Sequence, residues 1–291
     1  EPSIASLLTS LYPSQLNITC KAGIACQPHL DDRRTTLAET LRGLGYRTQA
    51  YVASLWLTAE LGFDQGYDGF ESVRTGEPFD VWPMRARTLG RLLGCRTGSA
   101  ACLLLVEGHG LLFDAPIPHE EGGREVNSRV ERFLDLHGDE RFFLWVHYNE
   151  ALPPYDTEPP IEPLPADPSG SGERRLRKMG FWQLGDPFTA TEDTLPSDGE
   201  RLAALYDGEI HGLDNLAGQL LGLLESAGLE ETTLVVLTSD HGQEFMEHGG
   251  YTYGHSLYDE VLRVPLIFAG PGTEAGHVVG TPAGLLDLAP T

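Results

Sequence analysis

The sequence predicts an α/β fold, in which a mostly parallel central sheet carries helices on both faces. Short apolar runs rich in β-branched and aromatic residues, such as 142–147 (FFLWVH) and 234–237 (LVVL), have the length and composition of buried strands. They alternate along the chain with longer segments whose apolar residues have helical spacing. A chain that alternates in this way forms a parallel sheet covered by helices on both sides.

The expected helices are recognised by apolar spacing and by residues that favour helix ends. Residues 2–13 have apolar residues at helical spacing and close at Pro13. Residues 36–44 form a second amphipathic segment, which stops before Gly45 and leads into a strand pattern over 46–53. Further helices are expected at the ranges 84–93, 125–136 and 201–227.

Two stretches interrupt this alternation. Residues 62–70 (GFDQGYDGF) combine Gly and Asp with aromatic residues and predict a turn segment. Residues 156–200 are rich in Pro, Gly, Ser and charge, and long segments of this kind are usually functional or mobile loops. We therefore expect a single domain over residues 1–291 with a long surface excursion at about 156–200.

The charge balance bears on the possible partners. The chain has 20 basic and 43 acidic residues, a formal net charge of -23. Nucleic-acid phosphates need Lys and Arg to replace counterions, so no nucleic-acid partner is expected. No apolar run approaches the roughly 20 residues that a transmembrane helix requires, so no transmembrane segment is expected in this chain.

The cysteines leave the redox state open. They form two local pairs in the sequence, Cys20 with Cys26 and Cys95 with Cys102, and neither spacing matches a zinc site. Two small disulfide loops and buried free thiols are both compatible with these spacings. The triplet Asn17-Ile18-Thr19 is a glycosylation sequon, which matters only in a eukaryotic secretory context.

The strongest candidate site follows the strand pattern at 234–237, which ends in Ser239-Asp240-His241-Gly242. Polar groups at the carboxyl ends of buried strands are where open α/β sheets bind ligands. A carboxylate beside an imidazole suits a divalent cation, with the carboxylate favouring calcium, magnesium or manganese and the imidazole favouring zinc. The alternative is an Asp that caps the next turn beside a solvent-facing His.

The same stretch carries a family resemblance. TLVVLTSDHGQEFMEHG (233–249) and GHSLYDEVLRVPLIFAGPG (254–272) resemble the carboxyl-terminal signature of the sulfatase family, within the alkaline phosphatase superfamily. Blocks at 2–13, 36–48, 62–70, 143–155 and 206–214 resemble family blocks in the family's order.

This resemblance implies an alkaline phosphatase-like domain that hydrolyses sulfate, phosphate or phosphonate esters of small molecules or glycans with a divalent metal. The metal is usually calcium in sulfatases, with manganese or zinc as alternatives. Asp240 and His241 would be metal ligands. By family spacing the nucleophile, a Cys, Ser or Thr, would lie just before Glu1, so we expect a chain truncated at both ends that lacks its first strand and is inactive alone.

Two positions depart from the family pattern. The family often has a His that contacts the transferred group, and Leu152 occupies that place in Glu150-Ala151-Leu152-Pro153-Pro154-Tyr155. Tyr253 stands where relatives often have Lys or His, and it brings no positive charge at neutral pH. His255 remains as an anion contact or leaving-group acid, with Tyr253 as a neutral hydrogen-bond donor to the substrate.

These departures keep a second hypothesis open, in which the domain is catalytically silent and acts as a binding or structural module. The family and the cysteines together imply a periplasmic, secreted or cell-envelope location. The substrate itself is not specified by any motif in the chain.

Overall fold

The computed structural model describes residues 2–16, 18, 29–54, 57–73, 122–152, 155, 161, 163–164 and 196–291. The chain divides into two compact units, residues 1–73 with 122–291 and residues 74–121, and the second lies wholly outside the described residues. The helix expected at 84–93, the four cysteines, and Asn17 and Thr19 of the sequon also lie outside the described residues. The prediction of a single domain with a surface excursion stays a prediction.

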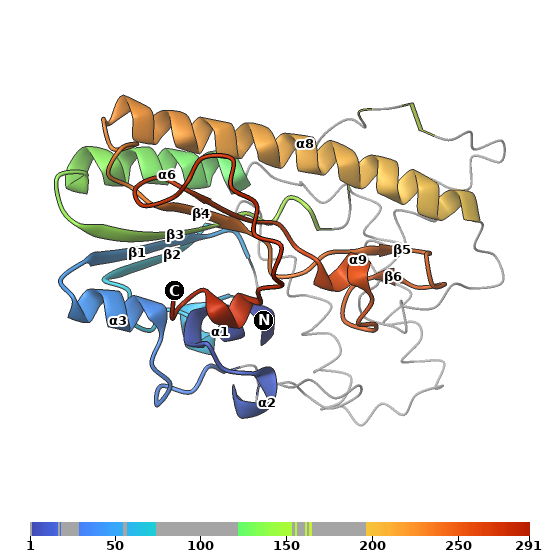
Figure 1. The fold of residues 1–291 in the computed structure, drawn as a ribbon, viewed down its shortest axis with the longest axis horizontal. Helices are drawn as coiled ribbons and strands as arrows, with labels where there is room; N and C mark the ends of the chain where they lie inside the picture. Colours follow the sequence, from blue (N-terminus) through green and yellow to red (C-terminus); the bar gives the residue numbers. More distant parts are fainter. Residues whose placement is uncertain are drawn as a thin grey trace, which may run out of the picture. The chain divides into compact units, whose positions relative to one another are not determined.

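A parallel sheet forms the centre of the first unit (Figure 1). Its strands lie in the order β2 (Gly69–Ser72), β1 (Arg47–Val52) and β3 (Phe142–His147). Strand β1 pairs in parallel with both neighbours, and Val52 lies opposite His147 at the carboxyl end. The sequence predicted β1 and β3, whereas β2 begins at the end of the stretch 62–70 that we expected to be a turn.

Helices cover both faces of this sheet (Figure 1). On one face, α1 (Pro2–Thr9) and α3 (Leu37–Gly43) pack with alternate residues of β1 and β3 in a cluster that includes Leu8, Val52 and Trp145. On the other face, α6 (Gly122–His137) packs with Tyr51 and the intervening residues of β3. This alternation is the period of two expected for a strand buried on both sides.

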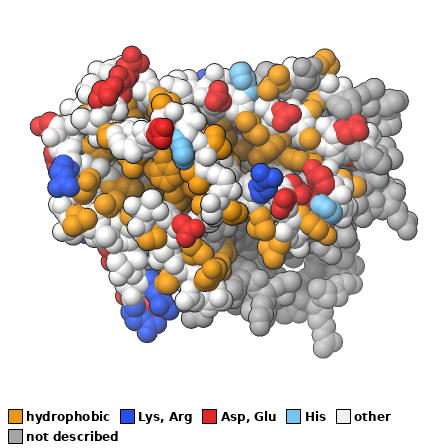
Figure 2. Space-filling model, in the orientation of Figure 1, with side chains coloured by type: hydrophobic (Ala, Val, Ile, Leu, Met, Phe, Trp, Pro, Cys, Tyr) orange, Lys and Arg blue, Asp and Glu red, His pale blue; other side chains and the backbone are white. Residues whose placement is uncertain are grey.

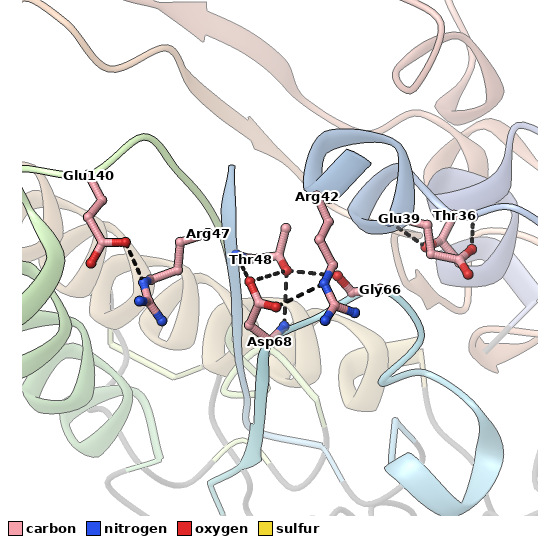
Figure 3. Close-up of polar contacts among 8 residues, drawn as sticks. All are labelled: Thr36, Glu39, Arg42, Arg47, Thr48, Gly66, Asp68 and Glu140. Carbon is pink, nitrogen blue, oxygen red and sulfur yellow. Dashed lines mark hydrogen bonds and ion pairs between the residues drawn. The ribbon is translucent and has the colours of Figure 1, made fainter. Parts of the chain in front are cut away.

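A polar network joins α3 and the amino end of β1 to the turn that precedes β2 (Figure 3). The buried Thr48 donates its backbone N–H to Oδ2 of Asp68 at 3.0 Å and its hydroxyl to the Gly66 carbonyl at 2.7 Å. Arg42 of α3 forms an ion pair with Asp68 at 2.9 Å. Gly66 has a φ of +85°, and a Cβ there would lie 2.3 Å from the backbone nitrogen of Glu39, so only glycine fits.

The longest helix connects this scaffold to the C-terminal half. Helix α8 (Pro196–Ser226) begins inside the range expected as surface excursion. Near its carboxyl end, Leu224 joins the cluster formed by α6 and β3, and near its amino end Leu202 packs with Tyr155 and Tyr251. No described helix is both long and apolar enough to cross a membrane.

Strands β4 (Val235–Thr238) and β7 (Leu266–Ala269) form a separate antiparallel pair. Val235 packs against the cluster beneath α6 and α8, whereas Val236 and Ile267 are 42% and 55% exposed. Figure 2 accordingly shows hydrophobic side chains at the surface where Figure 1 draws β4.

The remaining elements are short. The hairpin of β5 (Glu244–Phe245) and β6 (Tyr251–Thr252) lies between β4 and β7 in the chain, together with α9 (Asp259–Leu262). The other short elements are α2 (Pro13–Leu16), η1 (Ala59–Leu61) and η3 (Leu285–Asp287), a 3-10 helix that contacts α1. Helix α1 ends earlier than predicted, since Ser10 has a φ of 56°, which no α-helical residue adopts.

Candidate functional site

Asp240 and His241 follow the end of β4 after one residue, Ser239, as the sequence predicted. Oδ1 of Asp240 lies 3.6 Å from Nε2 of His241, and both side chains are about one-fifth exposed. Nδ1 of His241 lies 2.9 Å from the carbonyl oxygen of Gly242. A carbonyl only accepts, so Nδ1 carries a proton, and in the neutral imidazole the lone pair of Nε2 lies on the side of Asp240.

This arrangement fits a divalent cation. Metal-ligating histidines usually donate their second ring N–H to a carbonyl or carboxylate, which fixes the tautomer, and His241 does so. A carboxylate oxygen and an imidazole lone pair at this separation can reach one ion together. The oxygen and nitrogen atoms of Asp240 and His241 are therefore suitable ligands for one divalent ion.

The backbone after His241 is held by a close contact with α9. The Gly242 N–H donates to the carbonyl of Val261 at 2.8 Å. A Cβ at Gly242 would lie 2.0 Å from the backbone oxygen of Glu260, so no larger residue fits. Ser239 donates its hydroxyl to the His241 carbonyl at 2.7 Å and closes the turn on the other side.

Tyr253 lies against His241. The two ring centroids are 3.9 Å apart and their planes are inclined by 23°. The structure therefore brings together three of the residues that the sequence indicated, Asp240, His241 and Tyr253. The role of Tyr253 as a substrate contact stays a prediction.

The carboxylate of Glu244 organises the β5–β6 hairpin. Glu244 is 1% exposed, and its two oxygens accept hydrogen bonds from the backbone N–H groups of His248 and Gly250, Nε2 of His255 and the hydroxyl of Ser256. Burial opposes ionisation of Glu244, but the hydrogen bonds from Ser256, Gly250 and His255 together keep its pKa below the ordinary value.

His255 is thus placed by Glu244. Its Nε2 lies 2.9 Å from Oε2 of Glu244, and because the ionised carboxylate only accepts, this nitrogen carries the proton. The predicted role of His255 as anion contact or acid stays a prediction. No sequence pattern connects Glu244 with His255, since a buried Glu and an exposed Glu look alike in a single sequence.

A second set of possible metal ligands lies beside this hairpin. Among the described residues, ligand atoms of Glu244, His248 and Glu260 lie within 4.8 Å of one another. Nδ1 of His248 is 2.6 Å from Oε1 of Glu260, and the His248 ring stacks on Tyr258. The oxygens of Glu244 already accept four hydrogen bonds, so this group is better explained as a hydrogen-bond network than as a cation site.

His147, at the carboxyl end of β3, is a site residue that the sequence did not indicate. Burial lowers the pKa of this imidazole, and the nearby Asp240 carboxylate raises it in opposition. Its Nδ1 is buried and has no hydrogen-bond partner among the described residues. The carboxyl ends of β3 and β4 therefore converge, although these strands belong to separate sheets.

Residues 149–152 form a turn next to His147. The Leu152 N–H donates to the carbonyl of Asn149 at 3.3 Å, and Glu150 accepts from the Gly123 N–H at the start of α6. Gln243 donates to the Ala151 carbonyl at 3.4 Å and joins this turn to the segment after β4. Leu152 itself offers no polar atom beyond its backbone.

These features define an α/β protein in which a carboxylate and an imidazole lie side by side after β4. The sulfatase family model matches residues 1–291, and the chain belongs to the sulfatase family. The fold is likewise that of alkaline phosphatase-like sulfatases. The predicted family and fold class are thereby confirmed.

Individual relatives match parts of the chain or its fold. Arylsulfatase K of Xenopus laevis is 40% identical over 90 residues, which are 31% of this chain and 17% of that protein. A low-salt glycan biosynthesis sulfotransferase of Haloferax volcanii is 39% identical over 99 residues, 33% of this chain and 24% of its own. A phosphonate monoester hydrolase from Silicibacter pomeroyi has the same fold, with a TM-score of 0.60 and 22% identity, over 100% of this chain and 62% of that chain.

Proposed function

We propose that the full protein hydrolyses a sulfate ester, or a related phosphate or phosphonate ester, with the help of a divalent metal. The observation that carries this proposal is the Asp240–His241 pair, in which the hydrogen bond from Nδ1 to the Gly242 carbonyl leaves the Nε2 lone pair of His241 available to a metal. Family membership supports the reaction class. The relatives named for arylsulfatase and phosphonate monoester hydrolase activity support the same range of substrates.

The metal would be held from this chain by Asp240 and His241. When bound, a divalent ion polarises the ester oxygens and helps to activate a nucleophile. Calcium is the family's usual ion, and the imidazole ligand also suits manganese or zinc. The carboxylate fixes the position of the ion by charge, while His241 contributes a directional lone pair.

Two further residues have proposed roles. His255 is proposed to contact the anionic group of the substrate or to protonate its leaving group, with the carboxylate of Glu244 holding the imidazole. Tyr253 is proposed to belong to the same site as an uncharged side chain that lies against the His241 ring. The substrate is proposed to be a small-molecule or glycan ester, and the location periplasmic, secreted or on the cell envelope.

The direct test is hydrolysis of 4-nitrophenyl sulfate, 4-nitrophenyl phosphate and a phenylphosphonate ester by the full-length protein with calcium, manganese or zinc. The Asp240→Ala variant should lose about 10³-fold in turnover, because it loses a metal ligand worth several kcal/mol in the transition state. Glu274→Gln, whose carboxylate is 83% exposed, serves as a control and should keep full activity. Equal turnover by Asp240→Ala and the wild type would reject the proposal.

The second candidate is a silent binding or structural domain, which Leu152 and Tyr253 favour. Leu152 has no side-chain hydrogen-bond donor, and Tyr253 carries no positive charge at neutral pH. Under this alternative, the full protein with metal would hydrolyse none of the three esters but would still bind inorganic sulfate or phosphate. Turnover that depends on Asp240 would exclude it.

A further inference from the structure

The ring contact between Tyr253 and His241 links two separate segments of the site. Tyr253 follows β6, whereas His241 follows β4, and the rings lie nearly parallel with centroids 3.9 Å apart. Thr252, directly before Tyr253, has a φ of 66°, which is rare for a β-branched residue. Such strained conformations persist only where the surrounding structure holds them, so the backbone that leads into Tyr253 is held by its surroundings.

The orientation of the His241 ring matters because only one of its nitrogens can be the ligand. The hydrogen bond from Nδ1 to the Gly242 carbonyl holds one edge of the ring, and Tyr253 covers one of its flat faces. Rotation of the imidazole about its Cβ–Cγ bond would break both contacts. Together these contacts keep Nε2 on the side of Asp240.

We propose that Tyr253 is a positioning residue for His241, whose stacked ring holds the imidazole ready for the metal. This inference rests on the proposed function, since it takes Asp240 and His241 as metal ligands. Tyr253 then acts through the His241 ring and not through direct contact with the transferred group. Its aromatic ring, not its hydroxyl, is the essential part.

The chain offers a matched control for this role. His248 and Tyr258 form a second stacked pair, with centroids 3.5 Å apart and planes inclined by 13°. His248 shares a hydrogen bond with Glu260. Neither His248 nor Tyr258 is one of the proposed metal ligands. Removing the Tyr258 ring therefore tests the loss of a histidine–tyrosine stack in the same segment without touching the proposed ligands.

The experiment measures metal affinity in the full-length protein by calorimetric titration with calcium, manganese and zinc in turn. Tyr253→Ala should bind the metal about 10-fold more weakly, the size expected for a ring-stacking contact. Tyr253→Phe keeps the ring and should stay within about twofold of the wild type. Tyr258→Ala should also bind as the wild type does, and circular dichroism checks that each variant is folded.

Three outcomes would overturn the inference. These are wild-type metal affinity in Tyr253→Ala, an equal loss in Tyr253→Phe and Tyr253→Ala, or a raised KM in Tyr253→Ala with unchanged metal affinity. The last result would make Tyr253 a substrate contact. The readout is equilibrium binding, so failure of the protein to hydrolyse any ester would reject the proposed function without deciding the role of Tyr253.

Discussion

Two regions of the molecule are held together in different ways. The scaffold, which consists of the sheet β2-β1-β3 with α1, α3 and α6, is stabilised by apolar clusters on both faces. The site segment, residues 239–263, has few buried apolar residues and is organised by polar contacts around the carboxylate of Glu244. Stability and chemistry should therefore respond to different substitutions.

The difference follows from what each region does. Apolar burial is roughly proportional to area and tolerates some repacking, so it suits a frame. A hydrogen-bonded carboxylate demands fixed partners, because each donor or acceptor left unpaired in the interior costs free energy. Hydrogen bonds in the site segment thus fix the geometry of His241, Tyr253 and His255. Removal of one hydrogen-bonding group should therefore cost much of the free energy of unfolding.

The largest expected effect is that of Glu244→Gln in the site segment. The amide keeps the size of the carboxylate but places an N–H₂ group against donors, so we expect a loss of about 3 kcal/mol in the free energy of unfolding. Metal affinity should fall as well, since the hairpin carries Tyr253. Urea unfolding and calorimetric titration measure the two quantities, and Glu274→Gln on the exposed surface is the control.

The contribution of the Glu244 carboxylate to the free energy of unfolding should also depend on pH, in a defined direction. The pKa of Glu244 is lowered in the folded protein, so its stabilising contribution is complete above the ordinary value of 4.5 and is lost as the pH falls below it. The acid limb of the stability curve should be shallower in Glu244→Gln than in the wild type. An unchanged acid limb would show that the carboxylate does not contribute in this way.

A smaller effect is expected for Val52→Ala in the scaffold. Val52 is fully buried between the sheet and α1, and removing two methyl groups should cost about 2 kcal/mol of unfolding free energy. Metal affinity should stay unchanged, because no polar contact of the site segment is altered. A loss of metal binding equal to that in Glu244→Gln would remove the distinction between the two regions.

The smallest effect concerns His147, which belongs to the scaffold but faces the site segment. The Asp240 carboxylate raises the pKa of this imidazole, against the dominant effect of burial. Asp240→Asn removes that charge, so the pKa of His147 should fall further in the metal-free protein. Proton NMR of the imidazole across a pH titration measures it, and a raised pKa would contradict the convergence of β3 and β4.

The sequence predicted the scaffold better than the site segment. Strand β1 and helix α6 have periodic apolar patterns and β3 is a continuous apolar run, and a single sequence displays all three directly. Strands β5 and β6 and helix α9 have two to four residues each, too few for any period, and β2 begins within a stretch rich in glycine.

The site was predictable only in part, for a physical reason. Asp240 and His241 are adjacent in the chain and follow a clear strand pattern, so they were found. His147 lies about ninety residues earlier, and Glu244 looks like any surface Glu until its burial is known. Contacts made through tertiary folding leave no local pattern in one sequence.

The proposed metal site is tested most directly by the metal stoichiometry of the full-length protein and its Asp240→Asn variant, measured by elemental analysis after dialysis against calcium, manganese or zinc. Asparagine preserves the shape of the side chain but removes its charge, so the fold should persist while the ion is lost. We predict a bound ion in the wild type and its loss in Asp240→Asn. Equal metal content in the two proteins would contradict this prediction.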